Sequence, residues 1–352
     1  MSITLQAYNS NGLYNFIDTN PGNEPNWSAL TIDPSSNSSA VKLKFSFENK
    51  AVEMTFTGTF PDNVASMGTL SALFSSNVTG YALSMGGQQF KSYNFSTPLT
   101  IETVIKLEQG TNQQLIASLY SGNDTFIGST TTSTDENDWI NGWAGNDIFY
   151  SNALTHSSSI DGFYGNDGLD TAVFNGNRAN YQISQTNTNM GNAAYSVSGT
   201  GFRVTDLTDA QAQSTTLLSV ERVRFADQAL ALDSTAAGNA GKTMEIIALL
   251  VPAAINDLSL RKNVLDLFDA GKSMAQISQL ALDLGVVPSN STALAQAVYQ
   301  NVFGRAGDTG TIKAWSDYID SHGAANSLAT AAELHLNVDL VGLAVTGMAY
   351  AL

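Results

Sequence analysis

The sequence predicts a multidomain α+β protein with an N-terminal antiparallel, sandwich-like β domain and a C-terminal α-helical bundle. Three observations support this class. Apolar and polar residues alternate in the first third, Gly and Asp dominate a central segment, and apolar residues recur every three or four positions near the end. The expected domains are residues 1–118 (β domain), 119–173 (Gly/Asp-rich repeats), 174–235 (β module) and 240–352 (helices).

The N-terminal domain is predicted from its strand periodicity. Residues 41–47 and 52–56 alternate apolar and polar side chains, and residues 48–50 form a turn between them, which predicts a hairpin. A third alternation over residues 81–85 ends at Gly86-Gly87. Burying one face of such strands is usually achieved by an antiparallel sandwich.

Five aspartates in the central segment keep a common spacing: Asp124, Asp138, Asp147, Asp161 and Asp170. The steps between them are 14, 9, 14 and 9 residues, so each long step is a nine with a five-residue insertion. Two positions after each aspartate lies a residue whose side chain is expected to point into a core. These residues are Phe126, Ile140, Phe149, Phe163 and Ala172. This spacing matches the nonapeptide G-G-x-G-x-D-x-U-x, in which U is apolar.

The repeat predicts calcium binding for a chemical reason. Glycines permit positive φ and a close approach of backbone carbonyls, and the Asp supplies a carboxylate, so each turn offers the oxygen ligands that Ca²⁺ prefers. We expect two to four ions. The candidate ligand and turn residues are Gly122, Asp124, Asp138, Gly142, Gly145, Asp147, Asp161, Gly165, Asp167, Gly168 and Asp170. The repeat is imperfect, since Asp138 lacks a glycine two residues before it and Asp167 also fits the Asp position.

The segment after the repeats again alternates like strands, around Tyr181, Tyr195 and Phe202, and closes with residues 220–227 and 229–233. It is therefore expected to be a small β module.

The C-terminal part is predicted to be helical. Leu260, Val264, Leu267 and Phe268 form one stripe, and Ser273-Met274-Ala275-Gln276 is a capping box that opens the next helix. That helix is expected to bury one stripe and to end at Gly285. The stripe is Met274, Ile277, Leu280, Ala281 and Leu284, and two further helices carry Leu294 with Val298, and Ile312, Trp315 and Ile319.

Residues 119–352 resemble the C-terminal part of RTX (repeats-in-toxin) exoproteins with hemolysin-type calcium repeats. The resemblance rests on the repeats, on residues 168–174 and 220–227, and on residues 298–308 with Trp315, which approximate a helical domain of unknown function in such proteins. It implies a parallel β-roll over the repeats and export by a type I secretion transporter that reads an uncleaved C-terminal segment. Residues 338–352 fit such a segment and fit a last core helix equally well.

Composition excludes several classes of function. The net charge of −16, from 31 acidic and 15 basic residues, disfavours nucleic acid, and no apolar run is long enough for membrane insertion. The chain has no cysteine, and Met1 is not followed by a secretory signal pattern. Together with the repeats, these features indicate an extracellular or cell-surface location reached without such a signal.

The sequence favours a protein that is not an enzyme. It contains no H-E-x-x-H, G-x-S-x-G or phosphate-loop motif, and its histidines (His156, His322 and His335) are scattered. A carboxylate-pair hydrolase using Glu48, Glu53 or Asp62 remains open. We expect a calcium-binding structural protein of a surface layer, filament or biofilm that self-assembles with calcium. The alternative is a calcium-stabilised adhesin or ligand-binding exoprotein.

Overall fold

The computed structural model describes residues 3–7, 31–47, 50–66, 71–85, 87–108, 117–128, 139–151, 160–191, 196–208, 214–334 and 338–352. The chain is a mixed α+β protein, as predicted, and divides into two compact units, Met1–Val220 and Glu221–Leu352. The division falls inside the segment 174–235 that the sequence marks as one β module.

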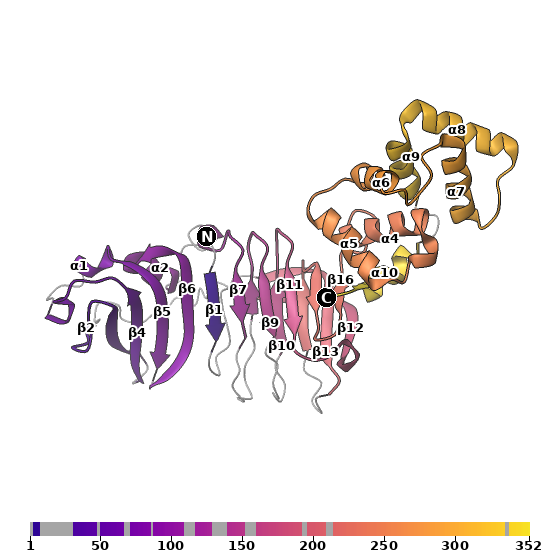
Figure 1. Ribbon diagram of the computed structural model, residues 1–352. Coiled ribbons are helices and arrows are strands. Elements are labelled where there is room, and N and C mark those ends of the chain that lie inside the picture. Colours follow the sequence, from indigo (N-terminus) through magenta and orange to yellow (C-terminus); the bar gives the residue numbers. More distant parts are fainter. Residues whose placement is uncertain are drawn as a thin grey trace. The chain divides into compact units, whose positions relative to one another are not determined.

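The first unit begins with an antiparallel sheet in the order β2-β3-β4-β5-β6-β1 (Figure 1). Its strands are β1 (Ile3–Ala7), β2 (Thr31–Ile32), β3 (Ala40–Phe47), β4 (Lys50–Gly58), β5 (Asn77–Met85) and β6 (Gln88–Thr100). The predicted hairpin is confirmed, because β3 and β4 pair with Val41 opposite Phe56, and both side chains are buried.

Two helices accompany this sheet in the described residues. Helix α2 (Ile101–Glu108) contacts β5 and β6, and α1 (Ser71–Phe74) packs against α2. Ile101 and Val104 are fully buried, and the Thr100 hydroxyl accepts a hydrogen bond from the Thr103 amide at 3.2 Å. The i, i+3 spacing of these apolar residues and the capping threonine are helix signals that follow strand β6 directly.

The repeat segment alternates between two ladders of parallel strands (Figure 1). One ladder contains β7 (Thr125–Ile127), β9 (Ile148–Ser151) and β11 (Thr171–Phe174). The other contains β8 (Trp139–Asn141), β10 (Ile160–Tyr164) and β14 (Ser214–Leu218). Strand β1 also pairs in parallel with β7.

The predicted inward positions of these strands are confirmed. The side chains of Phe126, Ile140, Phe149, Phe163 and Ala172 all have 0% of their surface exposed. The Phe149 and Phe163 rings stack with centroids 5.4 Å apart, and the Phe126 centroid lies 6.3 Å from that of Phe163. The two ladders therefore share one aromatic core. Strands β12 (Tyr181–Gly191) and β13 (Ser196–Asp206) form a hairpin that continues the second ladder through β14, and Tyr195 lies outside the described residues.

The second unit combines a small antiparallel sheet with helices. The sheet contains β15 (Arg222–Arg224), β16 (Ala229–Ala231) and β17 (Met348–Tyr350). The helices are α4 (Asn239–Leu250), α5 (Leu258–Asp269), α6 (Met274–Asp283), α7 (Ser291–Phe303), α8 (Thr309–His322), α9 (Ala324–Ala332) and α10 (Leu340–Thr346). None of the helices in the described part of the chain is both long and apolar enough to cross a membrane.

The predicted helix signals hold with one exception. The Ser273 hydroxyl accepts from the Gln276 amide at 3.2 Å and the Gln276 side chain accepts from the Ser273 amide at 3.0 Å, which is the predicted capping box. Helix α6 ends before Gly285, whose φ is +68°. However, Leu280 and Leu284 of its predicted core stripe are 39% and 70% exposed, because no described helix covers the end of that stripe.

The C-terminal residues are built into this unit. Strand β17 pairs with β16, and the Met348 side chain is fully buried. The Arg261 guanidinium donates to the Ala349 carbonyl at 3.1 Å, and the Ala351 amide donates to the Leu258 carbonyl at 3.1 Å. Residues 348–350 therefore form a strand of the folded unit.

An ion cluster ties the hairpin of this unit to its helices. The Arg222 side chain is 4% exposed and contacts the Asp233 carboxylate at 2.6 Å. It also binds both carboxylate oxygens of Asp269 on α5. Asn239 at the start of α4 donates its side-chain amide to Asp269 at 2.9 Å and its backbone amide to Asp233 at 2.9 Å.

Candidate metal centre

Three turns of similar shape precede the strands of the first parallel ladder. They comprise residues 119–124, 142–147 and 165–170, and each ends in an aspartate directly before a strand. Asp124, Asp147 and Asp170 are 1%, 0% and 0% exposed. Because β7, β9 and β11 are in register, these three aspartates form one column, which we call the aspartate column.

One oxygen of each carboxylate in the column can hold the preceding turn. Asp147 Oδ1 accepts the Asp124 amide at 2.7 Å, and Asp170 Oδ1 accepts the Asp147 amide at 2.8 Å. The turns also share backbone bonds, since the Asp124 carbonyl accepts the Ile148 amide at 2.9 Å. Each turn is thus fixed by the aspartate of the turn that follows it.

The second carboxylate oxygen of Asp147 and of Asp170 lies close to a glycine of its own turn, at a point where a Cβ would clash. Asp147 Oδ2 is buried and has no hydrogen-bond partner, and the Oδ2 atoms of Asp124 and Asp170 are also buried. A Cβ on Gly142 would lie 2.3 Å from Asp147 Oδ2 and 2.8 Å from the Gly165 carbonyl oxygen. We use the name first recess for the pair of oxygens at this place, Asp147 Oδ2 and the Gly165 carbonyl oxygen, whose close approach depends on the missing Cβ of Gly142.

The same arrangement recurs one turn later. A Cβ on Gly165 would lie 2.3 Å from Asp170 Oδ2 and 2.1 Å from the Ser219 carbonyl oxygen. This second recess therefore also lies between a carboxylate oxygen and the carbonyl of the next layer. Any residue with a side chain at Gly142 or Gly165 would meet these oxygens at distances that no real Cβ tolerates.

The backbone conformation of the turns brings them unusually close. Trp143 and Asn166 occupy equivalent positions with φ of +70° and +69°, in place of the second glycine of the repeat. Gly145 and Gly168 have φ of +121° and +144°, and a Cβ on Gly145 would lie 2.2 Å from the Gly122 carbonyl oxygen. These glycines are required both by their conformation and by the contact between turns.

Asparagines add a second column that sequence reasoning missed. Asn123 Oδ1 accepts the Asn146 amide at 2.8 Å, and Asn146 Oδ1 accepts the Leu169 amide at 3.0 Å. The buried Asn141 side chain accepts from the Trp143 amide at 3.0 Å. The available signal was the Asn-Asp pair that recurs 23 residues apart at Asn123 and Asn146.

Eight of the predicted site residues come together in these turns: Gly122, Asp124, Gly142, Gly145, Asp147, Gly165, Gly168 and Asp170. Three do not join them. Asp138 lies outside the described residues. Asp161 falls within strand β10 and does not close a turn. Asp167 has an exposed side chain and contributes its backbone, which pairs with Gly145 and Trp143. The alternating steps of 14 and 9 residues therefore place successive aspartates on different ladders.

The ligands at the recesses are oxygens and, in the described part of the chain, include no converging group of acidic or histidine side chains. Among the residues that the structure describes, no three His, Asp or Glu side chains converge at metal-binding distance. Each recess instead offers one buried carboxylate oxygen and one backbone carbonyl oxygen. Ca²⁺ accepts such mixed oxygen shells, whereas Zn²⁺ prefers the nitrogen and sulfur ligands that these turns lack.

The electrostatics of the column also favour a cation. Burial raises the pKa of the Asp147 carboxyl, and with the smaller effects of the Asp124 amide, which lowers it, and of the Asp170 and Asp124 charges, which raise it, the pKa is about 8. Asp147 is therefore largely protonated near neutral pH unless a cation compensates its charge.

We expect the metal-free turns to lose stability as the pH rises. At intermediate pH the folded state retains a proton on Asp147 that the unfolded state releases. The contribution of Asp147 to the free energy of unfolding is therefore complete below the pKa of an unfolded aspartate, ~4. It is lost as the pH rises to about 8. Thermal unfolding in chelator at about pH 5 and about pH 8 measures this loss. Asp147→Asn is the control, because it removes the titrating group, and an equal loss in this variant would contradict the assignment.

The carboxylates considered for hydrolysis lie apart from the column. Glu53 pairs with Lys42 at 3.0 Å and with Lys44 at 3.4 Å, Asp62 is exposed, and Glu48 lies outside the described residues. Comparison of the chain with protein-family models, with curated proteins and with solved structures gave no match. Function is therefore inferred from the stacked turns themselves.

Proposed function

We propose that this chain is a secreted calcium-binding structural protein of the RTX kind, which assembles at the cell surface or in the extracellular matrix when calcium is present. The observation that supports this most strongly is the first recess, in which the buried Oδ2 of Asp147, which has no hydrogen-bond partner, lies near the carbonyl of the next turn. A Ca²⁺ ion bound at the first recess would satisfy the Asp147 carboxylate and bridge two turns, and one at the second would link Asp170 to the Ser219 carbonyl.

Calcium binding of this kind is coupled to folding. The recess exists only when two turns are stacked, so the ion binds the folded state and not the unfolded chain. With extracellular site affinities of ~10⁻⁴ M and a few millimolar calcium, each ion stabilises the fold by about 2 kcal/mol. In the cytosol, where free calcium is far lower, the same turns would stay loose, which suits a chain that must pass through a transporter before folding.

Calcium would also reduce repulsion between copies of the chain. The net charge is −16, and two Ca²⁺ ions in the two recesses add four positive charges, giving a net charge of −12. With charged residues at only 13% of the chain, less repulsion then opposes contact between neighbouring molecules.

Hydrogen exchange with calcium and with chelator tests the calcium site. We expect calcium to slow exchange across residues 119–173 and to leave helices α5 to α9 unchanged. In Asp147→Asn the amide resembles the protonated carboxyl, so this variant should fold without calcium and should respond less to it.

Gly142→Ala is the second variant, because its Cβ would occupy the first recess. It should lose the calcium response near residues 142–147 while helices α5 to α9 remain protected. If calcium leaves exchange across residues 119–173 unchanged in the wild-type protein, the calcium site does not exist.

A further inference from the structure

Strand β12 is an edge of the five-stranded sheet in the first unit, where β13 pairs with one side of it (Figure 1). Its eleven positions contain neither proline nor a charged residue. The other strands that end a sheet in the described residues are short. Strand β2 has two residues, β8 has three, and β17 has three, with its Ala349 carbonyl bonded to Arg261. Folded proteins normally blunt a long edge with charge, proline or a bulge, and β12 has kept its edge open.

Half of the backbone groups of β12 face away from β13. The Leu207 amide donates to the Asn180 carbonyl at 2.8 Å, and these two residues continue the pairing in which Tyr181 stands opposite Asp206. Bonded and non-bonded pairs alternate in an antiparallel ladder, so the odd-numbered residues of β12 turn their amides and carbonyls outward. Arg178 donates to the outward carbonyl of Tyr181 at 2.6 Å, which agrees with this assignment. The next four outward residues are Ile183, Gln185, Asn187 and Asn189.

These four residues form an edge that is open to a second strand. The side chains of Gln185, Asn187 and Asn189 are exposed, and none of the four amides donates to another described residue. The Asn187 carbonyl accepts a long contact from the adjacent Thr186 hydroxyl at 3.4 Å, which leaves its second lone pair available. Donors and acceptors at this alternating spacing are matched by another extended backbone, so the edge selects a strand as its occupant.

We propose that β12 of a second copy of this chain occupies this edge, in antiparallel orientation about a two-fold axis at Thr186. In this register Ile183 stands opposite Asn189 of the copy. Gln185 likewise stands opposite Asn187 of the copy. All four are outward residues, so each outward amide of one chain meets an outward carbonyl of the other. The pairing therefore uses the open edge of both copies completely.

The side chains between these positions favour self-pairing over an unrelated strand. Thr186 faces the same residue of the copy, and Ser184 faces Thr188 of the copy. Threonine and serine directly opposite each other stabilise an antiparallel strand pair through their hydroxyl groups. Both the backbone groups and the side chains of β12 are thus complementary to a second β12, which is the property that a two-fold contact requires.

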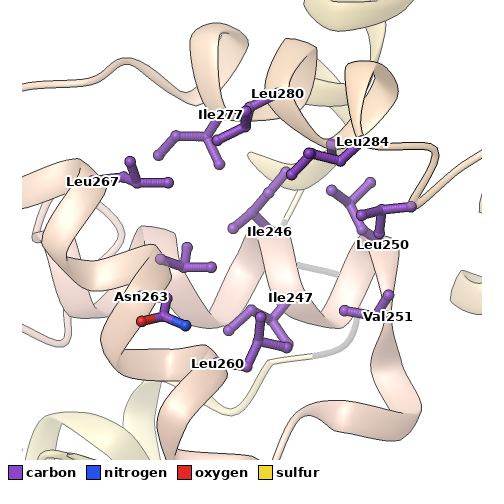
Figure 2. A pocket seen from close by; sticks show the side chains of 13 residues that line it. Ile246, Ile247, Leu250, Val251, Leu260, Asn263, Leu267, Ile277, Leu280 and Leu284 are labelled. Atoms are coloured by element: carbon purple, nitrogen blue, oxygen red, sulfur yellow. The ribbon is translucent and has the colours of Figure 1, made fainter.

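This inference rests on the self-assembly in the proposed function and assigns it a surface. A two-fold pairing closes as a dimer, so growth beyond the dimer uses a different surface. The groove between α4, α5 and α6 is not assigned that role, because its apolar lining, which includes Ile246, Leu260 and Leu280, selects no particular partner (Figure 2).

A charge swap at Thr186 tests the contact, because this residue would face its own copy. Thr186→Lys and Thr186→Glu each place like charges opposite each other, so in ~10 mM calcium each variant should associate on the order of 5-fold more weakly than the wild type. An equimolar mixture of the two variants should associate at least as tightly as the wild type, because opposite charges then face each other. Sedimentation velocity measures the association.

Ser198→Lys and Ser198→Glu are the matched controls for the charge swap. Ser198 is exposed on β13, one strand away from the edge, so both variants carry the same charge changes within the same hairpin. They should associate like the wild type, and mixing them should change nothing.

Gln185→Pro tests the backbone pairing. It removes an outward amide, at a position of an edge strand where proline is compatible with the fold. Each copy then loses its bond to Asn187 of the other, and with two bonds of about tenfold each removed, association should weaken about 100-fold.

The outcomes separate this contact from assembly itself. If the Thr186 variants associate weakly and their mixture does not recover, this residue does not face its own copy and the proposed pairing is wrong. If the Thr186 and Gln185 variants all associate like the wild type, β12 is not the contact while calcium-dependent assembly stands. If the wild type stays monomeric in calcium, assembly itself fails and the contact with it.

Discussion

Replacing Arg222 with alanine is expected to destabilise the Glu221–Leu352 unit by about 3–5 kcal/mol, the cost of removing one partner of a buried ion pair. The Arg222 side chain is 4% exposed and bridges two carboxylates that are 19% and 16% exposed, those of Asp233 and Asp269. Without the guanidinium, two negative charges remain close together, and strand β15 loses its attachment to α5.

Thermal unfolding of the whole chain measures this effect, and a loss of this size lowers the melting temperature by roughly 10 °C or more. Arg224→Ala is the matched control. It removes the same side chain two residues along the same strand, where it is exposed, and should change stability by less than ~0.5 kcal/mol. Equal unfolding temperatures for the two variants would mean that the cluster contributes nothing to stability.

Phe163→Ala is expected to have a comparable effect on the first unit, about 3–5 kcal/mol, because it opens a cavity in the shared core of the two parallel ladders. The ring is 0% exposed and lies beside both Phe126 and Phe149. Under the proposed binding of calcium to the stacked turns, the variant should also need more calcium to fold.

Calcium titration of urea-unfolded protein, followed by circular dichroism, measures both effects. Tyr150→Ala is the control. Tyr150 follows Phe149 in strand β9 and its ring is half-buried, so the expected loss of folding stability is about 1 kcal/mol. A Phe163→Ala protein as stable as Tyr150→Ala would show that the core between the ladders is not the source of their stability.

Local patterns in the sequence predicted local structure well. The hairpin of β3 and β4, the buried residue two places after each aspartate, and the capping box at Ser273 all follow from period and turn chemistry. Each depends on residues a few positions apart, whose geometry the backbone fixes directly.

Features that depend on distant segments were predicted less well. The length of the loop before an aspartate decides whether that aspartate falls in a turn or in a strand. Asp161 keeps the spacing of the aspartate series, as Asp147 does, but it lies within strand β10. The sequence predicted a second sheet packed on the first, and helix α2 was not predicted. The helix signal at Ile101 is hard to recognise because it follows strand β6 without a break. The exposure of Leu284 could not be predicted from the sequence of helix α6 alone, because it depends on whether another element packs against that side chain.

The links between turns in the aspartate column all run in one direction, and this affects how the turns would respond to calcium. Asp147 and Asp170 each hold the turn before them, and the first recess belongs to two turns at once. The column is therefore a one-dimensional array in which every unit is coupled only to the units beside it. Under the calcium binding proposed above, the first ion would order a turn that the next ion needs, and occupancy would rise more steeply with calcium than for independent sites. The response then resembles a threshold, set by the column as a whole and not by the affinity of any one recess.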